Sequence, residues 1–202
     1  MTGTDIIGLT RTLTPEMAVA GYRSGIFPMA LPRLGVITWH RPDPRAILPL
    51  DALHVSRSLR RTLRRRTFSV TFDRAFADVM RGCAEGRPVW IGPEFHQAYG
   101  ELRRRGQAHS VEVWREGRLA GGLYGVHLGG AFFAESKFHR ETDASKVALV
   151  KLVERLRERG FTLLDVQYLT PHLAQFGVIE IPHRQYLRRL TEALAVERRF
   201  EA

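Results

Sequence analysis

From residue 68 to its C-terminal end, the sequence alternates between segments with strand periodicity and segments with helix periodicity. Apolar and polar side chains alternate over residues 68–72, as in a half-buried strand. Two helical patterns follow, then three strand patterns, and then helix, strand, helix, strand and helix. This order excludes an all-helical or an all-strand fold and predicts a sheet that is covered by helices.

The element boundaries come from capping residues, glycines and prolines. Asp73 and Asp143 are each expected to cap a helix, and Gly160 to end the longest one. Both proline-containing stretches, 26–32 and 39–45, are expected to be shaped loops, because proline interrupts regular helix. In chain order, the patterns predict a helix from Thr14 to about Gly25, an arginine-rich helix at 57–65, and strands at 68–72, 109–114, 119–128, 131–138, 161–167 and 178–181, with helices starting at 73, 93, 143 and 171 and a terminal helix around Tyr186.

From residue 68 onward this order is that of the GNAT acyltransferase fold. The expected fold class is therefore α+β, with a mixed sheet, helices on both faces and a small N-terminal subdomain in front. We expect residues 1–66 to form a helix and loop region with the basic helix, and residues 67–202 to form the GNAT-like catalytic domain.

Composition narrows the class of protein further. The 202 residues are 44% hydrophobic, which supports a real core, and no apolar run is long enough to cross a membrane. The N-terminus does not resemble a secretory signal, and a single cysteine, Cys83, fits a reducing compartment, so we expect a cytoplasmic protein. No Cys/His cluster has zinc-ligand spacing, so no metal is expected.

Five arginines follow the helical series i, i+3, i+4, i+7, i+8, namely Arg57, Arg60, Arg61, Arg64 and Arg65. Five like charges on one face repel one another, and the chain carries a net charge of +10. The stripe is either a solvated face or a surface that binds phosphates, and the net charge favours phosphates.

Two polar residues end a strand that is otherwise apolar. Asp165 and Gln167 are two positions apart, so their side chains point to the same side of the strand. A carboxylate and an amide on a buried strand are costly unless they are hydrogen-bonded. The pair is either a satisfied strand end or part of a functional site.

Three glycines, Gly121, Gly122 and Gly125, lie inside a predicted strand and allow a ligand or another backbone to approach closely. The sequence contains no phosphate-binding P-loop and no dinucleotide fingerprint.

Several stretches, in order across residues 14–190, resemble the leucyl/phenylalanyl-tRNA–protein transferases. They are GYRSGIFP at 21–28, RPDPRA at 41–46, LHVSRSLRR at 53–61, AHSVEVW at 108–114, GGLYGV at 121–126, Glu135-Ser136 with Phe138, ASKVAL at 144–149, and the Asp165/Gln167 pair.

This resemblance implies an aminoacyltransferase that uses no cofactor and no acetyl-CoA. Such an enzyme moves Leu, Phe or sometimes Met from aminoacyl-tRNA to the N-terminal amine of a protein that begins with Lys or Arg. The product enters the N-end rule pathway of protein degradation. We expect a monomer whose partners are the charged tRNA and the acceptor N-terminus.

The resemblance also assigns roles to residues. It implies that Gln167 holds the acceptor amine, that Asp165 orients Gln167, and that Glu135 lies beside the reacting end. Trp90 and Met29 correspond to the positions that pack against the terminal adenosine. Leu123 and Phe132 are expected to line an apolar pocket for the donated side chain. The tRNA acceptor stem is assigned to Arg57, Arg61, Arg64 and Arg65.

The chain departs from the family pattern at four positions. Met29 replaces a tryptophan, His40 replaces the second residue of a Trp-Trp pair, Lys137 replaces a pocket methionine, and Val166 replaces a cysteine. Lys137, with Arg140, raises the alternative of an arginyl-type transferase for acidic N-termini. A non-catalytic relative that binds tRNA or peptide is a second alternative. A conventional acetyltransferase is disfavoured, because residues 137–145 lack the glycines of an acyl-CoA site.

Overall fold

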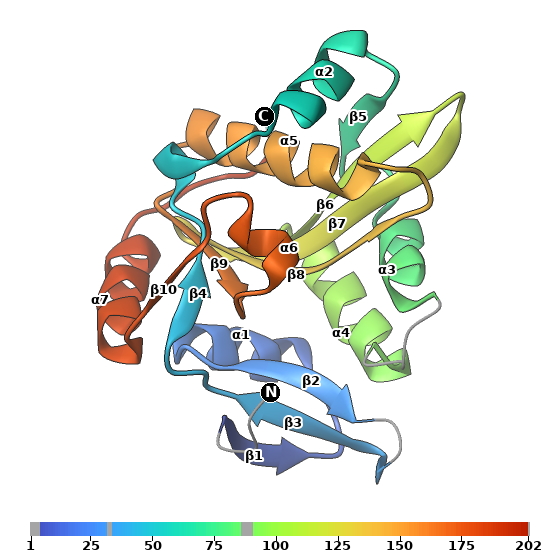
Figure 1. Cartoon of the computed structure of the whole chain (residues 1–202). Helices are drawn as coiled ribbons and strands as arrows, with labels where there is room; N and C mark the ends of the chain where they lie inside the picture. Colours follow the sequence, from blue (N-terminus) through green and yellow to red (C-terminus); the bar gives the residue numbers. More distant parts are fainter. Residues whose placement is uncertain (1–4, 32–33, 86–90, 202) are drawn as a thin grey trace.

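The computed structural model describes residues 5–31, 34–85 and 91–201, and its centre is a seven-stranded sheet (Figure 1). The strand order is β10-β4-β9-β8-β7-β6-β5. Strands β8 and β9 pair in parallel, and the other described pairs of this sheet are antiparallel. The strands are β4 (Arg45–Ile47), β5 (Ser69–Phe72), β6 (Ala108–Arg115), β7 (Arg118–Leu128), β8 (Ala131–His139), β9 (Leu163–Gln167) and β10 (Ile179–Ile181). The predicted mixed sheet is confirmed.

A second, three-stranded sheet of order β1-β3-β2 forms a small N-terminal unit next to the first helix (Figure 1). Its strands are β1 (Ile6–Thr10), β2 (Phe27–Leu31) and β3 (Val36–His40). Strand β4 follows β3 in the chain and belongs to the large sheet. The division between residues 66 and 67 stays a prediction.

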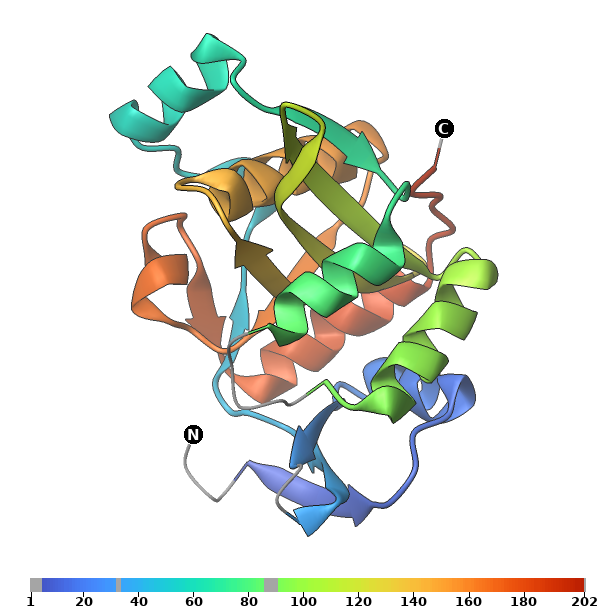
Figure 2. The same cartoon turned by 90° about the vertical axis from the view of Figure 1, so that its right-hand side faces the viewer.

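Helices cover both faces of the large sheet, as predicted (Figures 1 and 2). They are α1 (Pro15–Arg23), α2 (Arg57–Arg65), α3 (Phe76–Ala84), α4 (Pro93–Arg104), α5 (Ala144–Glu158), α6 (Pro171–Ala174) and α7 (His183–Leu194), with a short 3-10 helix η2 at Leu50–Ala52. Residues of α1, α3, α4 and α7 contribute to one buried cluster, and those of α2, α5 and α6 to a second. Among the described residues, no helix is long and apolar enough to cross a membrane.

The stretch at residues 26–32 was expected to be a loop, and that expectation is wrong. Residues Phe27–Leu31 form strand β2, which pairs with β3 and has no second neighbouring strand among the described residues. Proline lacks a backbone N–H, and an edge strand tolerates it because one side of the strand needs no partner. Pro28 is therefore compatible with this strand although it excludes helix.

Of the two aspartates expected to cap helices, Asp73 does not, and Asp143 takes the predicted N-cap position without a side-chain capping hydrogen bond. Asp73 lies before helix α3 with φ 62°, and its carboxylate accepts hydrogen bonds from the Ser110 backbone N–H. Asp143 occupies the N-cap position of α5 but makes no capping hydrogen bond. Its carboxylate instead accepts a hydrogen bond from Thr62 Oγ1 and pairs with Lys146.

The glycines in β7 allow close approach of the protein itself. A Cβ at Gly125 would collide with the Phe133 carbonyl oxygen and the Phe132 ring. A Cβ at Gly121 would lie 2.8 Å from Ala144 Cβ at the start of α5. These glycines therefore let α5 and β8 pack closely against β7.

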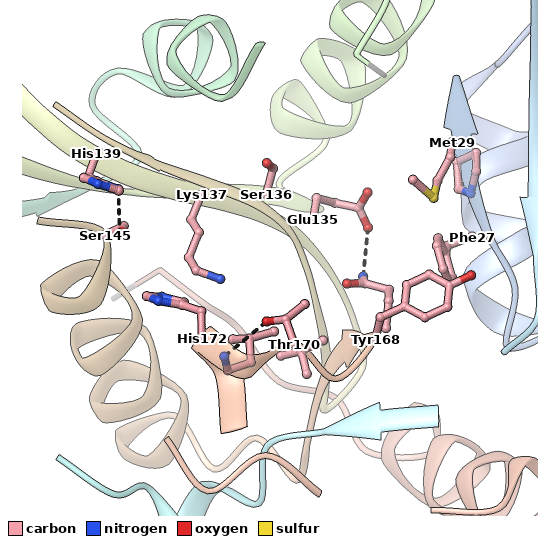
Figure 3. Close-up of a pocket in the computed structure, with 14 residues that line it drawn as sticks. Phe27, Met29, Glu135, Ser136, Lys137, His139, Ser145, Tyr168, Thr170 and His172 are labelled. Carbon is pink, nitrogen blue, oxygen red and sulfur yellow. Dashed lines mark hydrogen bonds between the residues drawn. The ribbon is translucent and has the colours of Figure 1, made fainter. Parts of the chain in front are cut away.

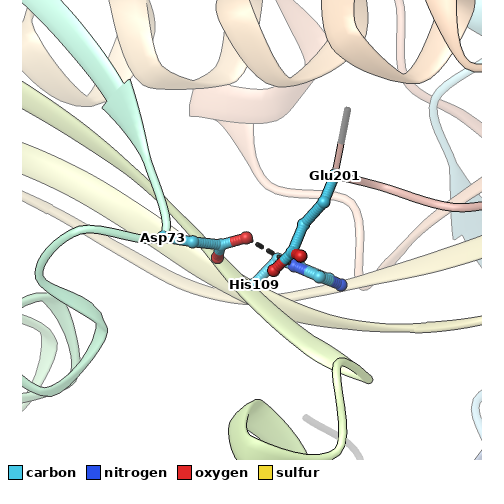
Figure 4. Close-up of side chains that lie close together, drawn as sticks. All are labelled: Asp73, His109 and Glu201. Carbon is cyan, nitrogen blue, oxygen red and sulfur yellow. Dashed lines mark hydrogen bonds and ion pairs between the residues drawn. The ribbon is translucent and has the colours of Figure 1, made fainter.

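A cluster of polar groups joins the C-terminal segment to β6 (Figure 4). His109 Nδ1 lies 2.7 Å from Asp73 Oδ2. A carboxylate oxygen of Glu201 lies within 4.8 Å of a possible ligand atom of each of these two residues. Arg103 neutralises this group, because its guanidinium pairs with Glu201 at 3.0 Å and with Asp73 at 3.7 Å. We assign the cluster a structural role.

Candidate active site

The large sheet opens where strands β8 and β9 stop pairing. Their parallel register ends at the pair Phe133 and Asp165. Two residues further along, Glu135 and Gln167 face each other, with Gln167 Nε2 donating to Glu135 Oε1 at 3.4 Å. The carboxylate and the amide predicted to act together are therefore adjacent, although they lie on different strands.

Asp165 is fully buried and forms an ion pair with Arg45. Arg45 Nη2 lies 2.6 Å from Asp165 Oδ2, and Arg45 Nε donates to Oδ1 at 2.9 Å. The hydroxyl of Tyr186 donates to Asp165 Oδ2 at 2.7 Å. The backbone N–H of Gln167 donates to Asp165 Oδ1 at 2.9 Å. This last bond holds Gln167 in a left-handed conformation with φ 62°, so Asp165 fixes the direction of the amide.

The Arg45 side chain is itself held in position. Its guanidinium carbon lies 4.7 Å from the ring centre of Phe27 and 4.6 Å from that of Tyr186. Arg45 Nη1 also donates to the carbonyl oxygen of Gly25 at 3.2 Å. Two aromatic rings and the hydrogen bonds to Asp165 and Gly25 make the Arg45 side chain a rigid support for Asp165.

Glu135 is supported by two buried tyrosines. Tyr99 donates to Glu135 Oε2 at 3.2 Å, and the hydroxyls of Tyr99 and Tyr22 are hydrogen-bonded to each other. Burial raises the pKa of Glu135 to about 7, against the lowering effect of the tyrosine hydrogen bonds. A carboxyl group with a pKa near neutrality is suited to accept and release a proton.

A pocket of about 400 Å³ lies against Glu135 and Gln167 (Figure 3). Its walls come from β2, from the second half of β8, from the start of α5 and from the end of β9 through α6. The lining residues are Phe27, Pro28, Met29, Glu135, Ser136, Lys137, His139, Ser145, Val166, Gln167, Tyr168, Thr170, His172 and Leu173. The predicted residues Met29, Glu135, Lys137 and Gln167 are thus brought together.

A smaller chamber of about 90 Å³ shares part of this lining and is mostly apolar. Leu123, Leu149 and Ala134 line the chamber but not the main pocket. The structure does not bring Phe132 to either cavity, since its ring is fully buried and packs 5.5 Å from that of Phe200. Phe132 belongs to the same buried cluster as Leu123, but it packs toward Phe200 and does not line the chamber.

Lys137 lines both the pocket and the chamber, beside His139 and His172 (Figure 3). Burial, with Lys137 nearby, lowers the pKa of His172. Arg140 lies elsewhere, because it pairs with Glu85 and its guanidinium lies 5.2 Å from the Phe138 ring centre. The predicted pairing of Lys137 with Arg140 at one site is therefore not found.

The arginine stripe lies on α2, as predicted. Arg57, Arg61, Arg64 and Arg65 are exposed, while Leu59 on the other side is 2% exposed and packs in the core. Thr62 of α2 donates to Asp143 at 3.1 Å, just before Ser145, which lines the pocket. The basic helix is thus joined to one end of the pocket. Trp90 lies outside the described residues.

Four supporting residues were missed at the sequence level, namely Arg45, Tyr186, Tyr22 and Tyr99. Arg45 belongs to the RPDPRA stretch, and a buried Asp165 requires a cationic or hydrogen-bonding partner. Those two facts together could have identified Arg45 as the partner of Asp165. The tyrosines carry no such signal, because their spacing is that of ordinary core residues.

A positioned amide, a carboxyl group with a pKa near neutrality and an adjoining apolar chamber fit an enzyme that transfers acyl groups. Residues 47–191 match the family described as leucyl/phenylalanyl-tRNA protein transferase, and residues 11–43 match its N-terminal domain. The chain belongs to the leucyl/phenylalanyl-tRNA–protein transferase family.

Relatives of that name share about half of the sequence. The protein from Salinibacter ruber is 56% identical over 184 residues, which cover 91% of this chain and 81% of the relative. The protein from Rubrobacter xylanophilus is 57% identical over 189 residues, which cover 93% of this chain and 98% of the relative.

Solved structures similar to this one include acetyltransferases of low sequence identity. A GCN5-related N-acetyltransferase from Kribbella flavida aligns with a TM-score of 0.45 and 11% identity, covering 82% of this chain and 60% of that one. An aminoglycoside N-acetyltransferase in complex with CoA aligns with a TM-score of 0.37 and 14% identity, covering 64% of this chain and 88% of that one.

Proposed function

We propose that this enzyme transfers an aminoacyl group from aminoacyl-tRNA to the N-terminal amine of an acceptor protein, with the reaction at Gln167 and Glu135. The observation that carries the proposal is the contact between the Gln167 amide and the Glu135 carboxylate at the wall of the pocket. The family of the chain supports the reaction class.

An aminoacyl ester is already activated, so the enzyme's task is to position a neutral amine against it. The amine nitrogen attacks the ester carbonyl carbon, the bond from that carbon to the ribose oxygen breaks, and an amide forms. Gln167 Nε2 is occupied by Glu135, which leaves the Gln167 carbonyl oxygen to accept a hydrogen bond from the amine. Glu135 receives the proton that the amine loses and passes it to the ribose oxygen, which leaves as a hydroxyl.

The donor occupies two sites in this proposal. The apolar chamber, which includes Leu123 and Leu149, receives the donated side chain and favours Leu, Phe or Met. The arginines of α2 hold phosphates of the acceptor stem, and contacts of that kind do not read the base sequence. Trp90 and Met29 are proposed to border the terminal adenosine.

The acceptor is proposed to begin with Lys or Arg, and the product to be a substrate of the N-end rule pathway in the cytoplasm. The enzyme needs no metal or cofactor for this chemistry and is proposed to act as a monomer. One observation favours a second candidate function, transfer of arginine to acidic N-termini. Lys137 lines the pocket beside Gln167, where a cation attracts a carboxylate and repels a basic side chain.

A matrix of charged tRNAs and peptides tests both candidates. Purified enzyme is mixed with Leu-, Phe-, Met- or Arg-tRNA carrying a radiolabelled amino acid, and with peptides that begin with Lys, Arg, Asp or Glu. The proposal expects transfer of Leu and Phe to the Lys and Arg peptides. Transfer of Arg to the Asp and Glu peptides alone supports the second candidate, and no transfer in any combination contradicts both.

A further inference from the structure

One side of the pocket holds an aromatic side chain that the reaction scheme does not use. Tyr168 follows Gln167 directly in the chain, is partly exposed, and lines the pocket with Phe27 and Met29 (Figure 3). The ring of Tyr168 meets that of Phe27 edge to face, with 5.7 Å between the ring centres. The ring of Tyr168 therefore provides a large apolar surface next to the Gln167 side-chain amide.

A chain of hydrogen bonds holds the Tyr168 ring. The donor and acceptor in each bond can be deduced by starting from Thr38, which donates to a backbone carbonyl oxygen. Thr38 Oγ1 donates to the carbonyl oxygen of Met29 at 3.0 Å, so Thr38 Oγ1 accepts from His40 Nε2 at 2.7 Å. His40 then carries its proton on Nε2, and its Nδ1 accepts from the Tyr168 hydroxyl at 3.1 Å.

The protonation states agree with this direction. Burial lowers the pKa of His40, which keeps the ring neutral, although the nearby carboxylate of Asp5 opposes that effect. Burial and the nearby carboxylate of Asp5 raise the pKa of Tyr168 to about 12, so its hydroxyl keeps its proton. A neutral histidine and a neutral tyrosine make one continuous link from the end of β9 to strands β3 and β2.

Phe27, which packs against the Tyr168 ring, is itself held in position. Phe27 stacks on His40 with 5.6 Å between ring centres, and Phe27 is covered by the Arg45 guanidinium at 4.7 Å. Tyr168, Phe27 and His40 thus form a fixed aromatic group at the edge of the pocket. An aromatic side chain held by both packing and hydrogen bonds has little conformational freedom to lose when it binds a flat partner.

We propose that Tyr168, held by His40 and Thr38, is the surface on which the donor's 3′-terminal adenine stacks. This inference rests on the proposed function, because it assumes that an aminoacyl-tRNA is the donor. In such a donor the ester and the adenine are attached to the same ribose. An ester placed at Gln167 therefore brings the adenine to the adjoining pocket wall, which is lined by Tyr168, Phe27 and Met29. Stacking of a base on an aromatic side chain is sequence-tolerant and strong enough to position it.

The test compares two small ligands that cannot react. One is a leucyl amide of 3′-amino-3′-deoxyadenosine, and the other is the same leucyl amide on a ribose without a base. Binding of each is measured by calorimetry to the wild type and to Tyr168→Leu, Tyr168→Phe and Leu169→Ala. Leu169 is the matched control, since it is the next residue, is 39% exposed and does not line the pocket.

We expect Tyr168→Leu to weaken binding of the adenosine compound by about 10- to 100-fold. Binding of the compound without a base should be unchanged. Tyr168→Phe keeps the ring and loses only the hydrogen bond, so we expect a loss of about 3-fold with the adenosine compound. Leu169→Ala should bind both compounds as the wild type does.

Two results overturn the inference. The first is an equal loss of affinity for both compounds in Tyr168→Leu. The second is an unchanged donor affinity with a raised KM for the acceptor peptide, which assigns the ring to the acceptor instead. If Tyr168→Leu does not fold, nuclear Overhauser contacts between the Tyr168 ring and adenine protons in the wild type decide, and their absence overturns the inference. A wild type that binds the adenosine compound but transfers nothing contradicts the proposed function and leaves this binding result intact.

Discussion

Arg45 and Asp165 form a buried ion pair, although 120 positions separate them in the sequence. Both side chains are 0% exposed. The pair joins the strand after the N-terminal unit to the strand that ends in Gln167. Because Asp165 also accepts the Gln167 backbone N–H, a buried ion pair that does not itself line the pocket sets the direction of the reactive amide.

The first prediction concerns this ion pair. Arg45→Met should lower the free energy of unfolding by about 3 to 5 kcal/mol, because it leaves the buried Asp165 carboxylate without its cation. Denaturant unfolding measures the change. Arg140→Met is the matched control, since the Arg140–Glu85 pair is exposed and such pairs contribute about 1 kcal/mol or less. Equal effects of the two substitutions would refute the importance assigned to the buried pair.

The second prediction uses the raised pKa of Glu135. Folding raises this pKa from 4.5 to about 7, so the folded protein keeps a proton on Glu135 at pH values where the unfolded chain has already released it. The stability from that proton is fully present below pH 4.5 and is lost as the pH rises to about 7. The wild type should therefore lose stability relative to Glu135→Gln across this range, by at most about 3 kcal/mol.

Unfolding free energies of both proteins at several pH values between 4 and 8 test this prediction. The offset between the two proteins at low pH reflects the substitution itself and serves as the reference. A difference that stays constant with pH means that Glu135 titrates in the folded protein as it does in water.

The third prediction concerns the α2 arginines. Arg61→Ala with Arg64→Ala should weaken tRNA binding and reduce the slope of log affinity against log salt by about 2, since each lost phosphate contact contributes about 0.9. Arg188→Ala with Arg189→Ala removes the same charge from exposed positions on α7 and should leave the slope unchanged. Filter binding over a range of salt concentrations measures both. An equal reduction by the two double variants would assign the effect to net charge alone.

The fourth prediction concerns Lys137. Lys137→Met should raise kcat/KM for peptides that begin with Lys or Arg by about 3- to 10-fold, because it removes a like charge from the pocket wall. Lys146→Met is the control, since Lys146 pairs with Asp143 and does not line the pocket. A loss of transfer to basic N-termini in Lys137→Met would show that Lys137 helps to bind the substrates.

The sequence was sufficient to predict the order of helices and strands after residue 68. Period-two and helical patterns are unambiguous there, and turns such as Glu116-Gly117 mark the ends of the strands. The N-terminal unit was less predictable, since Pro28 indicates a loop in isolation. Whether a proline lies on a sheet edge depends on which strands pair, and that is a tertiary property.

The site was predictable only in part. Asp165 and Gln167 were found because polar groups on an apolar strand require an explanation, and Glu135 was found through the family resemblance. Tyr99 and Tyr22 were not found, because buried tyrosines in helices have the same pattern whether or not their hydroxyls reach a carboxylate. Phe132 and Leu123 looked equivalent in sequence, yet only Leu123 reaches the chamber.

The most direct test of the account is single-turnover transfer by Gln167→Ala. The wild type and the variant are loaded with Leu-tRNA, mixed rapidly with a peptide that begins with Lys, and followed to the peptide product. We predict that the rate of transfer falls at least about 100-fold while donor affinity stays within about 3-fold, because Gln167 positions the amine and does not hold the tRNA. A rate equal to that of the wild type, or a loss of rate fully explained by a loss of donor affinity, would contradict the account.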